Sequence, residues 1–319
     1  MLKASRFDMI RGPVKRIQLL ILSGITAGLL LAACGPASPV EGPALNFTPA
    51  GDAPLVEGEA APEVVATVNG QPIAYETFQR ELARFEAGQT ALGLQVADQA
   101  TVRQQVLDLL IEQELIRQRA AASGISVTPE QIDTEINNMI AENGEEYFQS
   151  WLTGNFYSLD EFRELVRLDL LTAQLKDPVI NSVPASAEQV HAQHILVNSE
   201  AEANEILARL SAGEDFAVLA AEYSVDVTTR HAGGDLGWFP RGALLVPEVE
   251  AAAFSLQPGQ TSGVVPSAWG YHVVRTLEYD PNRALSPEAR QRLVERAIET
   301  WRQGLRDGAA IEQLITFTS

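Results

Sequence analysis

The sequence predicts an α+β protein, in which a mostly helical region surrounds a shorter segment of mixed strands and helices. Three observations support this fold class. Apolar residues recur mostly at helical spacing from residue 64 to about residue 183. Short apolar runs, separated by helical segments and glycine-rich turns, follow in residues 187–280. A last amphipathic segment lies in residues 281–319, and the length of 319 residues allows about two domains.

Residues 1–33 have the pattern of a secretory signal peptide. Three basic residues between positions 11 and 16 precede an uncharged stretch, residues 19–33, which is shorter than the roughly 20 residues of a membrane-spanning helix. The stretch ends in Leu31-Ala32-Ala33-Cys34, which resembles the bacterial lipobox. This resemblance implies cleavage before Cys34 and lipidation of that cysteine. An ordinary signal peptide with an incidental cysteine is the alternative.

The composition restricts the partners and the chemistry of the chain. Its net charge is −19, and removing the signal peptide, with five basic residues and one acidic residue, would make it −23. A surface this acidic repels phosphate backbones, so we expect no nucleic acid partner. Because Cys34 is the single cysteine, an internal disulfide and a cysteine-based metal site are excluded. Residues 34–62 are rich in proline and lack lysine and arginine, which predicts a flexible tether after the lipidated cysteine.

Residues 63–186 are predicted to form a helical N-terminal domain. A short strand, Val64-Val65-Ala66-Thr67-Val68, is followed by a turn at Asn69-Gly70. Thr128 and Ser158 each have a glutamine or glutamate three residues later, a capping-box pattern that predicts two helix starts. Pro178 and Pro184 are expected to mark the end of the last helix of this domain.

Residues 187–280 are predicted to form a separate domain of strands and helices. His194-Ile195-Leu196-Val197 has the pattern of a strand, and helices are expected over residues 199–210 and 216–223. Gly233-Gly234-Asp235-Leu236-Gly237 is expected to be a turn that shapes the backbone. In residues 281–319, Ser286-Pro287-Glu288 opens a helix with one apolar face, which we expect to pack on the N-terminal domain because a single amphipathic helix is unstable alone.

The middle segment also carries an ordered series of short motifs. In chain order they are His194-Ile195-Leu196-Val197, Gly213-Glu214-Asp215-Phe216, Ala220-Ala221-Glu222-Tyr223-Ser224-Val225-Asp226, Gly233-Gly234-Asp235-Leu236-Gly237-Trp238-Phe239, Val246-Pro247-Glu248, Gln257-Pro258-Gly259 and Gly270-Tyr271-His272-Val273-Val274. Together they resemble the parvulin peptidyl-prolyl cis-trans isomerases. The flanking helices are similar in arrangement to the SurA/PrsA group of foldases, in which a parvulin module with a small antiparallel sheet is inserted in a mainly helical chaperone domain.

The resemblance implies a set of catalytic residues and no cofactor. By resemblance, His194 and His272 are the paired histidines of the family core, Asp226 lies beside the substrate carbonyl, and Ser267 joins the histidine network. Two neutral imidazoles can each donate and accept a hydrogen bond, so they can link Asp226 with Ser267. Rotation about an X–Pro amide breaks no bond to carbon, so it requires neither a nucleophile nor a metal.

Three further positions match the substrate pocket of the family. Leu245, Val249 and Phe254 fall at pocket-lining positions. Val249 replaces the phenylalanine that many active parvulins have after Pro-Glu, and one extra residue lies between Gly242 and Val246. A smaller wall loosens the pocket and admits water, which favours a chaperone with little isomerase activity as the alternative.

Other interpretations of the same residues are open at this stage. The histidine pair could be a purely structural network, and Asp226 could cap a turn. The glycine-rich segment lacks the lysine and the strand–loop–helix setting of a phosphate loop. His191 and His194 are three residues apart, so on a strand they face opposite sides and cannot share a metal ion. A serine hydrolase is disfavoured because no nucleophile-elbow sequence is present.

The sequence therefore predicts an extracytoplasmic foldase. It would be anchored by lipid to the outer face of the bacterial cell membrane or to the periplasmic side of an envelope membrane. Its partners would be unfolded exported polypeptides that contain proline, without nucleic acid or metal. The alternatives are a holdase chaperone with a weak or inactive parvulin domain, and a structural envelope lipoprotein.

Overall fold

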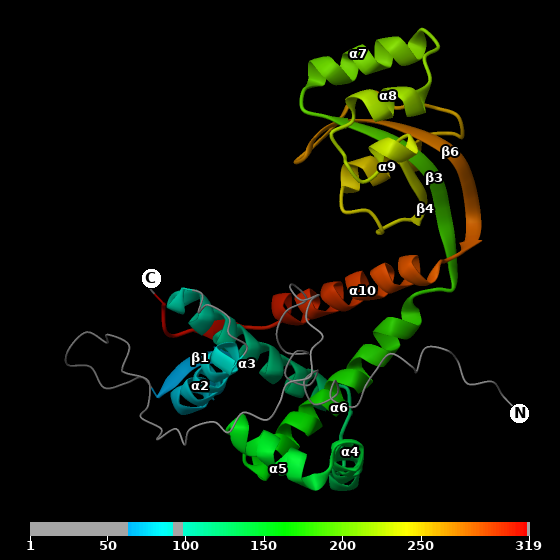
Figure 1. Ribbon diagram of the computed structural model, residues 1–319. Helices are drawn as coiled ribbons and strands as arrows, with labels where there is room; N and C mark the ends of the chain where they lie inside the picture. Colours follow the sequence, from blue (N-terminus) through cyan, green and yellow to red (C-terminus); the bar gives the residue numbers. More distant parts are fainter. Residues whose placement is uncertain (1–62, 92–97, 318–319) are drawn as a thin grey trace, which may run out of the picture. The chain divides into compact units, whose positions relative to one another are not determined.

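A computed structural model describes residues 63–91 and 98–317, and the chain divides into two compact units (Figure 1). Of the described residues, those up to Lys176 and those from Gln303 onward form the first unit, and Asp177–Arg302 form the second. The expected signal peptide, the tether and Cys34 lie outside the described residues. None of the helices in the described ranges combines the length and apolar character that a membrane span requires. The α+β class is confirmed, whereas the domain limits at residues 62, 186 and 280 stay predictions.

A small antiparallel sheet in the first unit joins the two ends of the described chain. Strands β1 (Val64–Val68) and β2 (Gln71–Ala74) form a hairpin through the expected turn at Asn69-Gly70. Strand β7 (Ile311–Gln313) pairs with the other side of β1, so the order is β2-β1-β7 and β2 is an edge strand. The pairing of β7 was not predicted, because its three residues carry no strand pattern of their own.

Among the described residues, the first unit contains five helices, in the region whose apolar spacing predicts a mostly helical domain. They are α2 (Tyr75–Ala91), α3 (Gln99–Ala122), α4 (Pro129–Asn143), α5 (Glu145–Gly154) and α6 (Leu159–Ser182), whose last residues belong to the second unit. Both expected capping boxes are present, at Thr128 and at Ser158. Helix α6 ends at Ser182, between the two prolines that were expected to mark its end, so Pro184 lies just beyond the helix and Pro178 lies inside it. A proline removes one backbone hydrogen bond, and here the helix tolerates that loss.

The first unit has two hydrophobic cores. One lies among β1, β2, α2 and α3, and side chains from the end of the chain pack on it, including Leu305 and Phe317. The Phe317 ring stacks on Phe78 with 5.6 Å between ring centroids. The second core lies among α4, α5 and α6 and is built around Phe148, Trp151 and Phe162.

The second unit is built on an antiparallel sheet of order β4-β3-β6-β5 (Figure 1). Its strands are β3 (Ser186–Val197), β4 (Asp235–Pro240), β5 (Val265–Ser267) and β6 (Gly270–Ala284). Strands β3 and β6 are long and central, and they pair from Ser186 opposite Ala284 to Val197 opposite Tyr271. A rigid central pair of this kind holds the side chains on its two strands in a fixed register.

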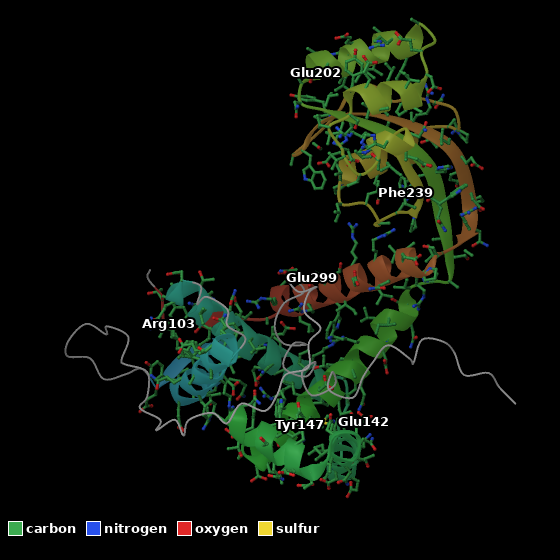
Figure 2. The ribbon with its side chains drawn as sticks, in the orientation of Figure 1. Arg103, Glu142, Tyr147, Glu202, Phe239 and Glu299 are labelled. Atoms are coloured by element: carbon green, nitrogen blue, oxygen red, sulfur yellow. The ribbon has the colours of Figure 1, made fainter. Side chains whose placement is uncertain are left out.

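Helices cover this sheet and bury two hydrophobic clusters. They are α7 (Glu200–Ser211), α8 (Phe216–Tyr223), α9 (Pro247–Ser255) and the short helix η2 (Arg230–Ala232). One cluster lies under α7 and α8 and includes Ile195 and Phe216. The other lies under α9 and includes Phe239, labelled on β4 in Figure 2, and Val249. Helix α10 (Pro287–Asp307) follows β6 and passes from the second unit into the first.

Candidate active site

Two buried histidines meet on the central strands of the second unit. His194 on β3 pairs with Val274 across the ladder, and His272 on β6 pairs with Leu196. The two histidines are therefore diagonal neighbours on one face of the sheet. Their Nδ1 atoms lie 3.3 Å apart and their rings stack at 18° with 5.5 Å between centroids. His272 has no exposed surface and His194 is 7% exposed, so water reaches this pair poorly.

Hydrogen bonds extend the pair into a chain of four side chains, which we call the histidine network: Asp226, His194, His272 and Ser267. His194 Nε2 lies 2.8 Å from Asp226 Oδ2, and His272 Nε2 lies 2.8 Å from Ser267 Oγ. The network runs from the loop after α8, which carries Asp226, to the last residue of β5, Ser267. Asp226 and Ser267, at its two ends, are partly exposed, so a substrate could reach either end without disturbing the histidines.

The carboxylate fixes the direction of the first hydrogen bond in this network, because it only accepts and His194 therefore donates to it from Nε2. With both rings neutral, the Nδ1 of His194 is then an acceptor. His272 must then donate from Nδ1 to His194, which leaves its own Nε2 to accept from the Ser267 hydroxyl. Ser267 Oγ in turn accepts from the backbone N–H of Trp269 at 3.0 Å. In the neutral state, each imidazole is thus held in one tautomer.

The Asp226 carboxylate is held by a tight turn. Thr228 donates to Oδ1 from its backbone N–H at 2.9 Å and from its hydroxyl at 2.6 Å. Thr229 donates its hydroxyl to Oδ2 at 2.6 Å, and that hydroxyl lies 3.1 Å from His194 Nε2. Asp226 therefore caps a turn and also contacts the histidine pair, so the two interpretations of this residue are compatible.

Burial and hydrogen bonding give Asp226 and His272, two members of the network, different charge states. Burial acts to raise the pKa of Asp226, but the hydrogen bonds from Thr228, Thr229 and His194 outweigh it and hold the pKa well below its usual range. Burial, and then the neighbouring His194, lower the pKa of His272 to about 4. At neutral pH the site therefore contains a fixed carboxylate beside an uncharged His272.

Two glycines allow the backbone to close around the histidines. Gly234 has a φ of +78°, and a Cβ there would lie 2.1 Å from the carbonyl oxygen of His194. Its own carbonyl accepts the His194 N–H at 2.9 Å. Gly270 has a φ of +135°, and a Cβ there would lie 2.5 Å from the carbonyl oxygen of Val197. The glycine-rich segment is therefore a backbone-shaping turn, as expected, because only glycine fits so close to β3.

Leu245, Val249 and Phe254, which were expected to line the substrate pocket, do not form one exposed surface. Leu245 is 85% exposed, although its loop is pinned by Glu250, whose carboxylate accepts from the backbone N–H groups of Gly242 and Leu244. Val249 is 2% exposed because α9 turns it into the core, so a substrate cannot touch it in this conformation. Phe254 is half-buried, with the Arg241 guanidinium 4.0 Å from the centre of its ring.

Sequence reasoning missed Thr228 and Thr229. Their position in the sequence could have identified them, because threonines two and three residues after an aspartate commonly donate hydrogen bonds back to it in a turn. His191 and His194 contact different carboxylates. His191 contacts Asp235 at 2.8 Å and His194 contacts Asp226. No group of three metal-ligating side chains gathers anywhere in residues 63–91 and 98–317.

Comparisons with known proteins agree with this arrangement. Residues 186–278 match the family model described as the PPIC-type PPIase (rotamase) domain, and residues 44–176 match that of the SurA-like N-terminal domain. A relative named Foldase protein PrsA, from Caldanaerobacter subterraneus subsp. tengcongensis, is 35% identical over 237 residues. That alignment covers 67% of this chain and 73% of the relative.

Further similar proteins carry the same name. Foldase protein PrsA of Bacillus subtilis is 28% identical over 244 residues, which cover 73% of this chain and 78% of that protein. Among solved structures, the peptidylprolyl isomerase PrsA of Bacillus anthracis is 27% identical, with a TM-score of 0.46. Its alignment covers 63% of this chain and 94% of that one.

Proposed function

The chain belongs to the family of the PrsA foldases, and we propose that its histidine network serves the isomerisation of X–Pro peptide bonds. Residues 186–278 are its PPIC-type peptidyl-prolyl isomerase domain, so the chain is a parvulin-type isomerase and an extracytoplasmic foldase that acts on unfolded polypeptides. We also propose that the site recognises proline, and we propose the roles of the individual side chains.

The chemistry requires that the enzyme stabilise a twisted amide. Rotation about the peptide bond has a barrier of about 18–20 kcal/mol because the planar amide is stabilised by resonance. In the twisted state the nitrogen is more basic and the carbonyl oxygen carries less negative charge. A fixed carboxylate beside that carbonyl opposes the planar ground state more than the twisted state, which lowers the barrier. A reduction of about 5 kcal/mol would accelerate the reaction several thousandfold.

The observation that carries this proposal is the saturated hydrogen bonding of Asp226. Its two oxygens accept from Thr228, Thr229 and His194, so the carboxylate is preorganised and need not rotate during the reaction. The two buried histidines behind it shield that side of the carboxylate from water. In this proposal Asp226 is the group beside the carbonyl, while His194, His272 and Ser267 hold it in place.

A proline-peptide assay of the full chain tests the function. We expect the wild type to accelerate the cis-trans isomerisation of a short unphosphorylated proline peptide, and Asp226→Ala to reduce the rate at least tenfold. Asp177→Ala, which removes an exposed carboxylate of the same unit, should leave the rate unchanged. If the wild type shows no acceleration over the uncatalysed rate, the proposal fails.

The lipid anchor at Cys34 is also part of the proposal. It is supported by Leu31-Ala32-Ala33-Cys34 at the end of the apolar stretch, and several acyl chains would give durable membrane attachment. Mass spectrometry of the membrane fraction should find an acylated peptide that begins at Cys34. Cys34→Ala should release the protein, and a mature protein starting at another residue would contradict the anchor.

The holdase is the second candidate function. It is favoured by the pocket residues, since the buried Val249 and the exposed Leu245 do not form a closed cup for a proline ring. In that case the chain would suppress aggregation of an unfolded protein, and Asp226→Ala would leave the suppression intact. The isomerase assay described above separates the two functions.

A further inference from the structure

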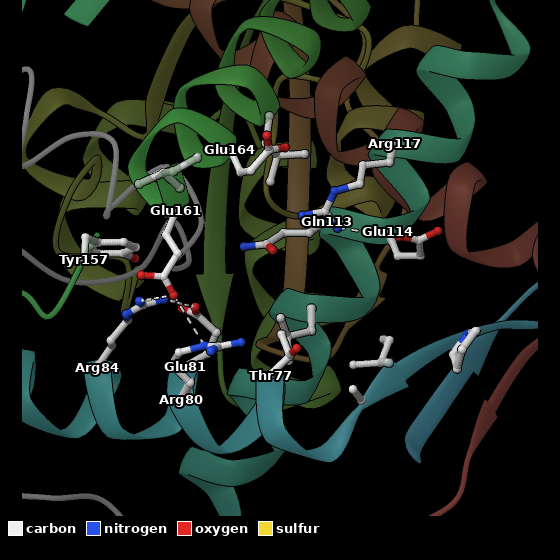
Figure 3. Close-up of a pocket in the computed structure, with 16 residues that line it drawn as sticks. Thr77, Arg80, Glu81, Arg84, Gln113, Glu114, Arg117, Tyr157, Glu161 and Glu164 are labelled. Carbon is white, nitrogen blue, oxygen red and sulfur yellow. Dashed lines mark hydrogen bonds and ion pairs between the residues drawn. The ribbon is translucent and has the colours of Figure 1, made fainter. Parts of the chain in front are cut away.

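A cavity of about 420 Å³ lies within the first unit, far in sequence from the histidine network. It is lined by β2, α2, α3, the loop before α6, and α6 itself (Figure 3). These elements belong to the two different cores of the unit, so the cavity lies where the cores meet. Its volume falls in the range of about 300–1,000 Å³ that is typical of ligand pockets. We call it the α2–α6 cavity.

The free edge of a sheet borders this cavity. Three consecutive residues of β2, namely Pro72, Ile73 and Ala74, line it. Because successive side chains of a strand point to opposite faces, a space that touches all three must lie along the edge of the strand. Strand β2 pairs with β1 on its other side, and within the described residues no strand pairs with its outer edge.

The register of the hairpin shows which backbone groups this edge offers. Val68 and Gln71 flank the two-residue turn and form the hydrogen-bonded pair next to it. By alternation, the backbone groups of Pro72 and Ala74 point away from β1. Proline at this place is typical of an edge strand, since it lacks an outward N–H. The carbonyl of Pro72 and the N–H of Ala74 are thus available to an incoming chain.

Two polar side chains of the cavity also lack partners. The Gln113 amide on α3 and the Thr77 hydroxyl on α2 line the cavity, and neither makes a hydrogen bond to any residue in the described ranges. An amide and a hydroxyl can each both donate and accept, which matches the alternating N–H and C=O groups of a peptide backbone. The floor is apolar and includes Leu110, Leu165 and Leu168.

The charges of the lining restrict the class of ligand. Arg84 donates to Glu161 at 2.8 Å and pairs with Glu81 (Figure 3). Arg80 lies 3.4 Å from Glu161, and Arg117 lies 3.5 Å from Glu114. All three arginines are therefore neutralised by glutamates, so the cavity offers no unpaired cation to a phosphate or another anion.

We propose that the α2–α6 cavity binds an extended segment of unfolded polypeptide, which adds a strand to the free edge of β2. The backbone of the segment pairs with Pro72 and Ala74, Gln113 and Thr77 bond the groups that face the helices, and an apolar side chain rests on the leucine floor. Such strand addition takes its affinity from main-chain hydrogen bonds, so it suits clients of many sequences. The proposal rests on the foldase function and assigns it a second peptide site, independent of proline.

The test uses the full chain and a fluorescent eight-residue peptide of alternating valine and threonine, which contains no proline. Binding is followed by fluorescence anisotropy. A second peptide has the same side chains but carries N-methyl groups on alternate residues, so it cannot donate to a strand edge. We expect the first peptide to bind and the N-methylated peptide to bind at least tenfold more weakly.

Two substitutions with matched controls localise the binding. Thr77→Trp fills the cavity from α2, and Gln79→Trp places the same side chain at an exposed position of the same helix. Gln113→Leu removes the free amide that lines the cavity on α3. Its control, Gln105→Leu, removes an amide at an exposed position of the same helix. Both cavity variants should weaken binding at least fivefold, and both controls should bind as the wild type does.

The isomerase rate on a short proline peptide, measured for each variant, separates this proposal from the proposed function. All four variants should keep the wild-type rate. No binding by the wild type, equal binding of both peptides, or wild-type binding by Gln113→Leu would overturn the strand-addition site whatever the isomerase rate. Should Thr77→Trp fail to fold, the N-methylated peptide and Gln113→Leu still decide the matter. If the wild type binds the peptide but does not accelerate isomerisation, the proposed function is refuted instead.

Discussion

The histidine network of the second unit and the α2–α6 cavity of the first unit handle polar groups in opposite ways. In the network, every side-chain group has a partner and His272 is completely buried. In the cavity, the arginines are paired, but Gln113 and the edge of β2 have unused hydrogen-bonding groups within the described residues. Both regions combine polar groups with apolar surroundings. Only in the histidine network does every polar side chain have a hydrogen-bond partner without a ligand.

This difference corresponds to two kinds of task. A reaction on one small group requires atoms held in one position, and a saturated buried network provides that rigidity. A site for segments of varied sequence instead requires free backbone and amide groups that can pair with any main chain. The four predictions below test how far the two regions differ, and they run from the largest expected effect to the smallest.

The largest effect is expected from His272→Ala. The change leaves a cavity in the core and removes the partners of His194 and Ser267, so it should lower the free energy of unfolding of the second unit by about 4 kcal/mol. Hydrogen exchange of the β3 and β6 amides in the full chain measures this. His191→Ala, on the same strand β3 but partly exposed, should cost less than about 1 kcal/mol. Equal losses in the two variants would show that the network is not saturated as described.

The pH dependence of stability should reveal the same buried histidine. The pKa of His272 is lowered to about 4, whereas an unfolded histidine titrates near about 6.5. As the pH falls from about 6.5 to about 4, the unfolded chain therefore binds a proton that the folded chain does not. Stability should fall over this window, by up to about 3 kcal/mol, and the His272 contribution should be fully present above it.

The variant His272→Gln serves as the reference for that measurement, because it lacks the titrating group. Hydrogen exchange or denaturant unfolding at pH 7 and at pH 4.5 should show a smaller loss of stability for this variant than for the wild type. Parallel pH curves for the two proteins would mean that His272 is not protected from protonation by the fold.

In the first unit, Arg84→Met should have an intermediate effect and lower the free energy of unfolding by about 2 kcal/mol. Arg84 donates to the Phe156 carbonyl at 2.8 Å, pairs with Glu161 and lies over the Tyr157 ring at 4.0 Å. Burial acts to raise the pKa of Glu161, but hydrogen bonds from Ser158 and Arg84 lower it to about 2. The variant should therefore lose stability and also raise the pKa of Glu161, which NMR titration of its carboxyl carbon can follow.

Arg167→Met is the matched control, since Arg167 and Glu164 form an exposed pair on α6. It should change the free energy of unfolding by less than about 0.5 kcal/mol. If Arg84→Met and Arg167→Met lowered the stability equally, the ion pairs of Arg84 would contribute no more than an exposed surface pair.

The smallest effect is expected from Val249→Phe. Because Val249 lies in the core under α9, the larger ring should overpack the cluster, cost about 1–2 kcal/mol and bring no gain in isomerase rate. Thermal unfolding together with the proline-peptide assay checks this. A faster reaction would show that residue 249 reaches the substrate after all, and that α9 moves when the peptide binds.

Much of the fold was readable from local patterns. The strand and turn at residues 64–70, the capping boxes at Thr128 and Ser158, and the paired histidines of the second unit were all expected, and the structure contains them. Each depends on neighbouring residues or on an ordered motif series. Capping, turn formation and periodicity act within a few residues, so the sequence alone determined them.

The remaining features depend on contacts between distant segments, which only the tertiary structure decided. Strand β7 pairs with β1 across more than two hundred residues, and its three residues have no strand pattern alone. Thr229 joins the network because its turn folds back onto β3, and Val249 is buried because α9 packs its first turn on the sheet. The outer edge of β2 is free because no other strand within the described residues pairs with it. Burial and strand order are properties of the assembled chain, so the sequence determined which groups were available and the fold decided which of them were left without a partner.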